Sequence, residues 1–132
     1  MVQKKILIVD DEEAVLSLLK EVFESAGYIV FMAKNAEEAL NILKTQSIMV
    51  MFLDLQLPSM SGLELCKKIR ANNQTALIYA LTGHSNFFGL MECRAAGFDD
   101  VLNKVVKIKV LLKAAEDAFE KLERWDSKNN VL

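Results

Sequence analysis

Several features are scarce in this chain, and each absence narrows its function. The 132 residues carry 18 acidic and 16 basic side chains, a net charge of −2, so no basic excess is available for nucleic acid or an anionic membrane. No apolar run is long enough to span a bilayer, and no basic and apolar leader opens the chain. We therefore expect a cytoplasmic protein with no direct nucleic acid contact and no membrane contact.

Cysteine and glycine-rich loops are also scarce. Cys66 and Cys93 lie far apart and form no metal-binding motif, and we interpret both as small packing residues in a reducing compartment. Neither GxGxxG nor GxxxxGK[ST] occurs, and the first predicted strand ends in Asp10-Asp11, which repels phosphate unless a metal is bound. These features argue against a flavodoxin-like binder of a nucleotide, flavin or other small ligand, which stays as one alternative.

The chain does contain a regular alternation of strand-like and helix-like segments. Short apolar runs predict strands at residues 5–9, 28–33, 48–53, 76–81 and 101–102. Between them, apolar residues recur at helical spacing, and Asn35 and Ser61, each with a glutamate three residues later, predict helix starts. Strands that are apolar throughout are buried on both faces, so we expect one α/β domain with a doubly wound parallel sheet.

Residues that could carry chemistry follow four of the predicted strands. In such sheets, ligands bind beyond the carboxyl ends of the strands, and those positions hold Asp10, Asp11, Asp54, Thr82 and Lys104. Taken singly, the aspartate pair could cap a helix, Thr82 could form a turn and Lys104 could be a solvated charge. Asp54 is harder to explain in this way, because an ionised carboxylate is costly at the end of a buried strand.

The combination of these groups indicates a phosphoryl-transfer site. Clustered carboxylates repel one another unless a cation such as Mg²⁺ neutralises them, and Mg²⁺ prefers a few oxygen ligands with water and phosphate oxygens. An ionised Asp54 beside the metal can act as a nucleophile toward phosphorus. The Thr82 hydroxyl and the Lys104 ammonium can then hold the phosphoryl oxygens.

At these residues the chain resembles the receiver domain of two-component response regulators, the family of the chemotaxis response regulator. The resemblance covers roughly residues 4–122. It rests on four motifs: Asp10-Asp11, Asp54-x-x-Leu57-Pro58-x-Met60-x-Gly62, Leu81-Thr82-Gly83, and Asp100-x-Leu102-x-Lys104. It implies a flavodoxin-like (βα)5 fold with five strands in the order 2-1-3-4-5, a receiver domain at residues 1–123, and a tail or the start of a linker at 124–132.

The resemblance also implies how the phosphoryl group and the metal are held. Asp54 accepts the phosphoryl group from a sensor histidine kinase or a phosphotransfer protein. Asp11 and Asp54 ligate Mg²⁺ directly, the Gln56 backbone carbonyl is a third protein ligand, and Asp10 acts partly through water.

Further implied roles concern activation and output. Thr82 and Lys104 contact the phosphoryl group once it is bound. The chain is then a signalling receiver rather than an enzyme, although it catalyses its own phosphotransfer and autodephosphorylation. Its state controls a downstream protein or effector domain. A degenerate receiver that acts only as a docking module stays as a second alternative.

Two positions depart from the family pattern. The family has an aromatic residue three positions before the lysine, where this chain has Val101, and a proline after the lysine, where it has Val105. A cis peptide bond before a non-proline residue costs about 2.5–4 kcal/mol, so we expect a trans bond there and an altered loop. Both departures affect the usual coupling to output.

Other residues near the site are candidates for roles in tuning and in output. Gln56, Gly83 and His84 are candidates for tuning access of water or a partner to the phosphoryl group. Phe87 and Phe88, with Val101, are candidates for an output face toward a partner or a second copy of the chain. The alternatives are an exposed loop histidine and phenylalanines packed on a neighbouring loop.

The last two helices are also predicted in outline. Ser85 is expected to cap the fourth helix, whose inward stripe should hold Leu90, Met91, Cys93 or Arg94, and Ala96. The last helix is expected from about residue 106, with apolar positions to Leu122 and then Trp125. The polar residues beyond form either a frayed tail or a linker.

Overall fold

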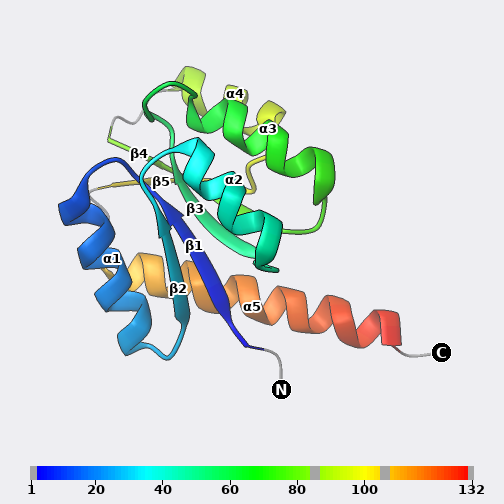
Figure 1. Cartoon of the computed structure of the whole chain (residues 1–132). Coiled ribbons are helices and arrows are strands. Elements are labelled where there is room, and N and C mark those ends of the chain that lie inside the picture. The colour runs from blue at the N-terminus through cyan, green and yellow to red at the C-terminus, as the bar shows by residue number, and fades with distance from the viewer. Residues whose placement is uncertain (1–2, 84–86, 105–107, 131–132) are drawn as a thin grey trace.

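The computed structural model describes residues 3–83, 87–104 and 108–130 (Figure 1). Its strands are β1 (Lys5–Val9), β2 (Ile29–Ala33), β3 (Val50–Asp54), β4 (Leu77–Thr82) and β5 (Asp100–Asn103). Its helices are α1 (Glu13–Ser25), α2 (Ala36–Thr45), α3 (Gly62–Asn72), α4 (Phe87–Ala96) and α5 (Ile108–Asn130). All neighbouring strands are parallel in the order β2-β1-β3-β4-β5, which confirms the predicted fold class and strand order.

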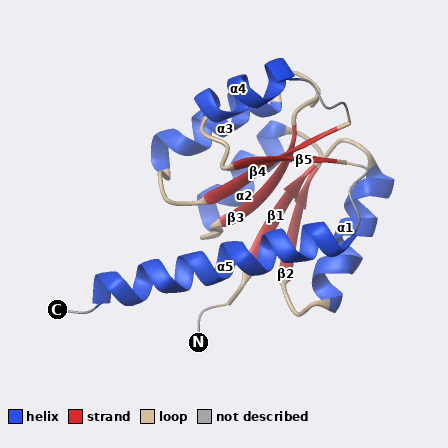
Figure 2. Ribbon diagram, turned by 180° about the vertical axis from the view of Figure 1, so that it is seen from behind, coloured by secondary structure: helices blue, strands red, loops and turns tan. Residues whose placement is uncertain are grey.

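Helices cover both faces of the sheet, as Figures 1 and 2 show. Leu7 and Val9 of β1 belong to the core cluster shared with α2, α3 and α4. Ile6 and Ile8 of the same strand belong to the cluster shared with α1 and α5. Successive side chains of a strand point to opposite faces, so burial on both sides requires the continuous apolar runs seen in the sequence.

The central strand β3 fixes the position of Asp54. All five residues of this strand are buried, and Asp54 lies in register with Leu81 of β4. Burying one large apolar side chain contributes about 1.5–3 kcal/mol, so Met51, Phe52 and Leu53 hold the strand in place. Asp54 is therefore carried to the carboxyl edge on a rigid element.

Helix starts follow the predicted caps, with one change. Asn35 Oδ1 accepts a hydrogen bond from Glu38 N, and Ser61 Oγ accepts one from Glu64 N. In a reciprocal cap, the glutamate side chain would accept a hydrogen bond from the N-cap residue, here Asn35 N. The Glu38 carboxylate instead accepts one from Lys34 N, one residue earlier. The predicted Ser85 cap lies outside the described residues.

The predicted inward face of α4 is partly wrong. Cys93 and Ala96 are buried as expected, but Met91 is 77% exposed and Leu90 is 39% exposed. The buried positions continue back one turn to the half-buried Gly89, which gives a stripe spaced by four and three residues. Leu90 and Met91 lie beside this stripe and face away from the core.

The last helix is longer than the expected core segment. α5 has 23 residues and runs through Asn130, so residues 124–130 are helical rather than frayed. At 1.5 Å per residue this is about 34 Å, and the helix projects past the sheet (Figure 2). A groove of about 590 Å³, lined partly by Leu77, Phe119 and Trp125, lies at that end. None of the described helices combines the length and the apolar character needed to cross a membrane.

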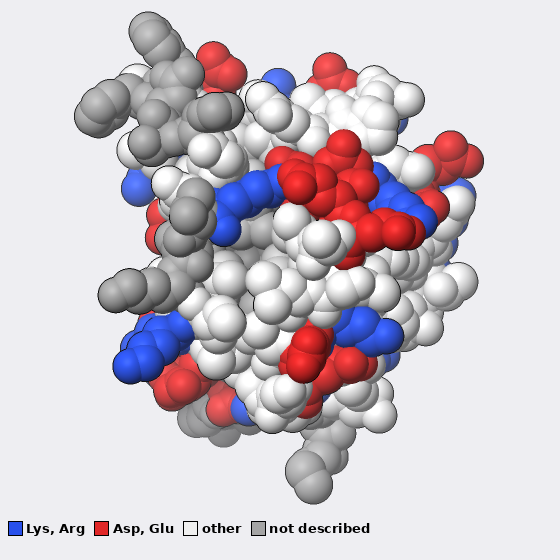
Figure 3. Space-filling model, turned by 90° about the vertical axis from the view of Figure 1, so that its left-hand side faces the viewer, with Lys and Arg blue, Asp and Glu red and all other residues white. Residues whose placement is uncertain are grey.

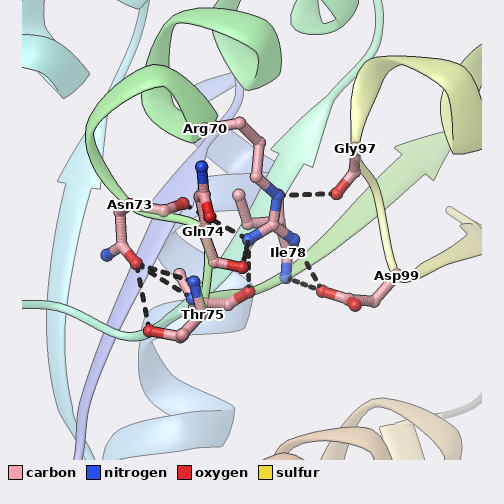
Figure 4. A network of polar contacts seen from close by, with 8 residues as sticks. Arg70, Asn73, Gln74, Thr75, Ile78, Gly97 and Asp99 are labelled. Carbon is pink, nitrogen blue, oxygen red and sulfur yellow. Dashed lines mark hydrogen bonds and ion pairs between the residues drawn. The ribbon is translucent and has the colours of Figure 1, made fainter.

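A polar network joins three elements at the amino edge of the sheet, opposite Asp54 (Figure 4). Arg70 on α3 donates from Nε to Gly97 O at 2.8 Å and from Nη1 to Ala76 O at 2.6 Å. Its Nη2 pairs with Asp99 Oδ2 at 2.9 Å, and the same oxygen accepts from Ile78 N at 2.8 Å. The network therefore ties α3, the start of β4 and the segment before β5 together.

Candidate functional site

The residues that the sequence placed at the carboxyl edge do meet there. Asp10 follows β1, Asp54 ends β3, Thr82 ends β4 and Lys104 follows β5. The backbone N–H of Lys104 donates to Thr82 O at 2.7 Å, so β4 and β5 end side by side. Figure 3 shows acidic side chains gathered on this side of the molecule, with basic side chains on either side of them.

Lys104 is the cation at the centre of the site. Its Nζ lies 2.9 Å from Asp10 Oδ2, 2.9 Å from Asp54 Oδ2 and 3.3 Å from Glu12 Oε1. Asp10 is fully buried and Asp54 is 3% exposed, whereas Glu12 reaches into solvent. One ammonium group thus bridges two buried carboxylates and a third at the rim.

The pKa values of Asp10 and Lys104 are set by two kinds of effect, burial and the contacts with neighbouring charged and polar groups. Burial raises the pKa of Asp10, and together with the negative charge of Asp54 it outweighs the lowering by the Glu12 N–H and by Lys104. Burial alone would lower the pKa of Lys104, but its close contacts with Asp54 and Asp10 and their negative charges outweigh it, so this pKa lies above its ordinary value. The ammonium is therefore held strongly in its charged form.

Local backbone contacts fix the orientation of Asp54. Gln56 N donates to Asp54 Oδ1 at 3.0 Å, and Leu55 N donates to Leu81 O at 3.1 Å. Gly62 N donates to Leu55 O at 3.0 Å, which draws the start of α3 against the end of β3. A Cβ on Gly62 would collide with the Asp54 carbonyl oxygen and would lie 2.8 Å from Leu55 Cα. Only glycine permits this approach, which explains physically why the motif ends at Gly62.

The residues present fit a hard divalent cation. Among the described residues, Asp10, Asp11 and Glu12 form a group whose carboxylate oxygens lie within 4.8 Å of one another. Asp10 Oδ2 is buried and receives no well-directed hydrogen bond in the described chain; its contact with Lys104 is an ion pair. A buried anionic oxygen that is balanced by an ion pair can serve a cation directly or through water, and an all-oxygen set suits Mg²⁺.

Glu12 is the residue at this site that the motif reasoning missed. The motif covers the Asp10-Asp11 pair alone, although Glu12 continues the same acidic run. Its backbone N–H donates to Asp10 Oδ1 at 2.9 Å, and its side chain reaches Lys104. The capping alternative for the aspartate pair is not what the structure shows, because the N-cap of α1 is Glu12 and has no side-chain cap hydrogen bond.

The structure describes some of the residues proposed for tuning and output, and others lie outside the described residues. Gln56 and Gly83 are exposed beside the site, and a Cβ on Gly83 would meet nothing within 4 Å. Val101 is half-buried and packs against the core cluster shared with α3 and α4. His84, Val105 and the peptide bond that joins Val105 to Lys104 lie outside the described residues. The side chains of Phe87 and Phe88 also lie outside the description.

Comparisons with known proteins identify the family. The family model of the response regulator receiver domain matches residues 6–116. The sporulation initiation phosphotransferase F of Bacillus subtilis is 32% identical over 97 residues, which cover 74% of this chain and 78% of that protein. The alkaline phosphatase synthesis transcriptional regulatory protein PhoP of the same species is 34% identical over 122 residues, which cover 87% of this chain and 51% of that protein.

Solved structures show the same relationship. The CheY-like response regulator receiver domain protein of Methanospirillum hungatei superposes with a TM-score of 0.88 at 29% identity, covering 93% of this chain and 98% of that one. A two-component response regulator from Clostridium difficile gives 0.87 at 28% identity, with coverage of 91% and 98%.

Fold and carboxyl-edge site together define an α/β signalling module of the flavodoxin-like class. The chain belongs to the response regulator receiver domain family of two-component systems. It spans about half the length of the PhoP relative and 28% of the cyclic di-GMP phosphodiesterase of Thermotoga maritima, which is 29% identical.

Proposed function

We propose that the chain is a phosphorylation-controlled receiver in which Asp54 accepts a phosphoryl group from a histidine kinase or phosphotransfer protein. The observation that carries this proposal is the bridge from Lys104 Nζ to Asp54 and Asp10, 2.9 Å from an oxygen of each. The carboxylates of this cluster carry more negative charge than one lysine neutralises. A protein that acted only as a docking module would have no need for this excess of buried negative charge. The family membership and the carboxyl-edge position support the same assignment.

Phosphoryl transfer to Asp54 would proceed by direct displacement at phosphorus. An Asp54 carboxylate oxygen attacks phosphorus; the new O–P bond forms as the N–P bond of a phosphohistidine breaks, and the electron pair leaves on the imidazole nitrogen. Gln56 N–H holds the carboxylate in orientation at 3.0 Å. Lys104 turns from the free carboxylate to the phosphoryl oxygens, and the Thr82 hydroxyl is expected to contact them as well. Hydrolysis by water then returns the carboxylate and inorganic phosphate.

Asp11, Asp54 and the Gln56 carbonyl are the groups we assign to direct Mg²⁺ ligation, with Asp10 acting through water. A bound Mg²⁺ supplies charge neutralisation for the carboxylates and the incoming phosphoryl oxygens. The acidic group at Asp10, Asp11 and Glu12 supports a cation at this edge. We also propose a cytoplasmic location, which the buried free thiols of Cys66 and Cys93 favour.

We further propose that the phosphorylation state controls a partner protein or an attached effector domain. The output face would include Phe87, Phe88 and Val101, with Gln56, Gly83 and His84 tuning the phosphoryl lifetime. Residues 1–123 would form the receiver, and the helical residues 124–130 would continue toward whatever follows. Contact between two copies of the chain is compatible with this output surface.

Labelling of Asp54 by a small phosphodonor tests the central proposal. The protein is incubated with phosphoramidate and Mg²⁺, and its intact mass is measured. We expect a gain of one phosphoryl group in the native chain, none in Asp54→Asn, and a normal gain in Asp117→Asn, where the exchanged side chain pairs with Lys113 on the remote surface of α5. Full labelling of Asp54→Asn would overturn the assignment, and no labelling of the native chain would favour the docking module.

A further inference from the structure

Glu12 contacts the cation on which the proposed chemistry depends. Its Oε1 lies 3.3 Å from Lys104 Nζ, and the same nitrogen lies 2.9 Å from Asp54 Oδ2. Of the three carboxylates around this ammonium, Asp10 and Asp54 are buried, while the Glu12 side chain is 63% exposed. Glu12 therefore holds Lys104 from the solvent side of the site.

The backbone keeps Glu12 in this place. Its N–H donates to Asp10 Oδ1 at 2.9 Å, and Glu12 is the N-cap of α1 with an extended backbone conformation. Its carbonyl oxygen accepts from Leu16 N at 3.1 Å, the first bond of the helix. The side chain is thus attached to a fixed point, directly after the two aspartates and within reach of Lys104.

A competition for Lys104 follows from the charges. In the unphosphorylated chain the ammonium serves three carboxylates at once. When a phosphoryl group occupies Asp54, its oxygens need the same ammonium, and the contact to Glu12 must weaken or break. A ligand shifts such an equilibrium only through the difference between its contacts in the two states.

We propose that Glu12 is a positioning residue that holds Lys104 in the resting arrangement and competes with the phosphoryl group for it. This inference rests on the proposed phosphorylation of Asp54. Glu12 thereby weakens the hold of the site on the phosphoryl group and favours return to the resting state. Its effect acts through Lys104 and not through negative charge in general.

The adjacent Glu13 is a matched control. It carries the same charge one residue further along, but its Oε1 pairs with Lys34 Nζ at 2.6 Å and not with Lys104. Glu13→Gln therefore removes the same charge from the same helical turn. It leaves the Lys104 contacts in place.

Binding of beryllofluoride, a stable analogue of the phosphoryl group, tests the proposal. Its apparent Kd is measured in saturating Mg²⁺ for the native chain, Glu12→Gln and Glu13→Gln, and again for the two glutamine variants in a Lys104→Met background. We expect Glu12→Gln to tighten binding about twofold to fivefold, the factor of one exposed ion pair, and Glu13→Gln to leave it nearly unchanged. In the Lys104→Met background the effect of Glu12→Gln should disappear.

The remaining outcomes are distinct. Equal tightening by Glu12→Gln and Glu13→Gln would mean a general charge effect and would overturn this inference, as would an effect that persists without Lys104 or a weakening of binding. In each of those cases the native chain still binds the analogue, so the proposed phosphorylation stands. Failure of the native chain to bind beryllofluoride at all would overturn both.

Discussion

One basic side chain organises each edge of the sheet, and the two do so differently. At the amino edge, the Arg70 guanidinium meets the carbonyl oxygens of Gly97 and Ala76 and, among the described residues, one carboxylate, that of Asp99. At the carboxyl edge, the Lys104 ammonium meets three carboxylates. The first network matches donors to acceptors, whereas the second leaves negative charge in excess.

This difference separates a structural network from a reactive site. A guanidinium presents a rigid, planar set of donors that can bind several backbone carbonyls at once. An ammonium on a flexible stem is a point charge that can leave one oxygen for another. The carboxyl edge also keeps Asp10 Oδ2 buried without a well-directed donor, a cost that a purely structural network avoids.

The largest expected effect is at Arg70. Arg70→Met should lower the free energy of unfolding by about 3–5 kcal/mol, because it leaves the carbonyls of Gly97 and Ala76 without this donor and removes the cation beside Asp99. Urea denaturation measures this, and Mg²⁺ should not restore the loss. The exposed Arg94→Met on α4 is the control and should change stability little. A loss below 1 kcal/mol would show that Arg70 is not the structural clamp of this edge.

Lys104→Met should break the carboxyl edge in another way. Labelling by phosphoramidate should fall about 10²-fold, because a charged donor to the transferring group is lost. Its lost stability, unlike that of Arg70→Met, should be partly restored by Mg²⁺, since the metal can neutralise Asp10 and Asp54. Labelling rates and thermal melts with and without Mg²⁺ measure both effects. Unchanged labelling would remove Lys104 from the chemistry.

Mg²⁺ alone should stabilise only the carboxyl edge. At ten times its Kd the metal should add about 1.4 kcal/mol to the unfolding free energy, by mass action on the folded state. Thermal melts of the native chain should therefore shift upward in millimolar Mg²⁺, and Asp11→Ala should lose most of the shift. Asp117→Asn should keep it. A full shift in Asp11→Ala would contradict the assigned ligands.

The smallest effect should appear at Asp10 as pH changes. Burial raises the pKa of Asp10 in the folded chain above its ordinary value of 3.8, so folding favours the protonated form. That contribution is fully present below the unfolded pKa and is lost as pH rises through the folded pKa. In EDTA, Asp10→Asn should therefore be more stable than the native chain at pH 7.

The gap between Asp10→Asn and the native chain should close as pH falls toward the ordinary carboxyl range. Denaturant melts across that range measure it, and Asp117→Asn should show no such closing gap. A native chain more stable than Asp10→Asn at neutral pH would contradict the sign.

Much of the carboxyl-edge site could be predicted from the sequence, but little of the amino-edge network could. Strands buried on both faces leave a periodic signal, and Asp54 stands out at the end of one. Arg70, Gly97 and Asp99 are ordinary residues in the sequence, far apart, and nothing local shows that they meet. Glu12 was missed because a contact of its side chain with Lys104 spans 92 positions.

The incorrect details have local causes. Leu90 and Met91 were placed inward because they are apolar, yet the phase of α4 is set by the small buried residues Cys93 and Ala96. Residues 124–130 have no apolar stripe that predicts a helix, but they continue one already formed, and extending a helix is easier than starting one.

The position of Trp125 makes the far end of α5 visible to spectroscopy. It is the one tryptophan of the chain, is 59% exposed and lines the groove at the amino edge. Four residue steps of β3 separate this edge from Asp54, about 13 Å at 3.3 Å per residue. Tryptophan fluorescence, excited at the long-wavelength edge of the protein absorption band, thus reports the environment of the projecting helix and its groove. An emission change on phosphorylation would be a direct optical sign that the signal crosses the sheet.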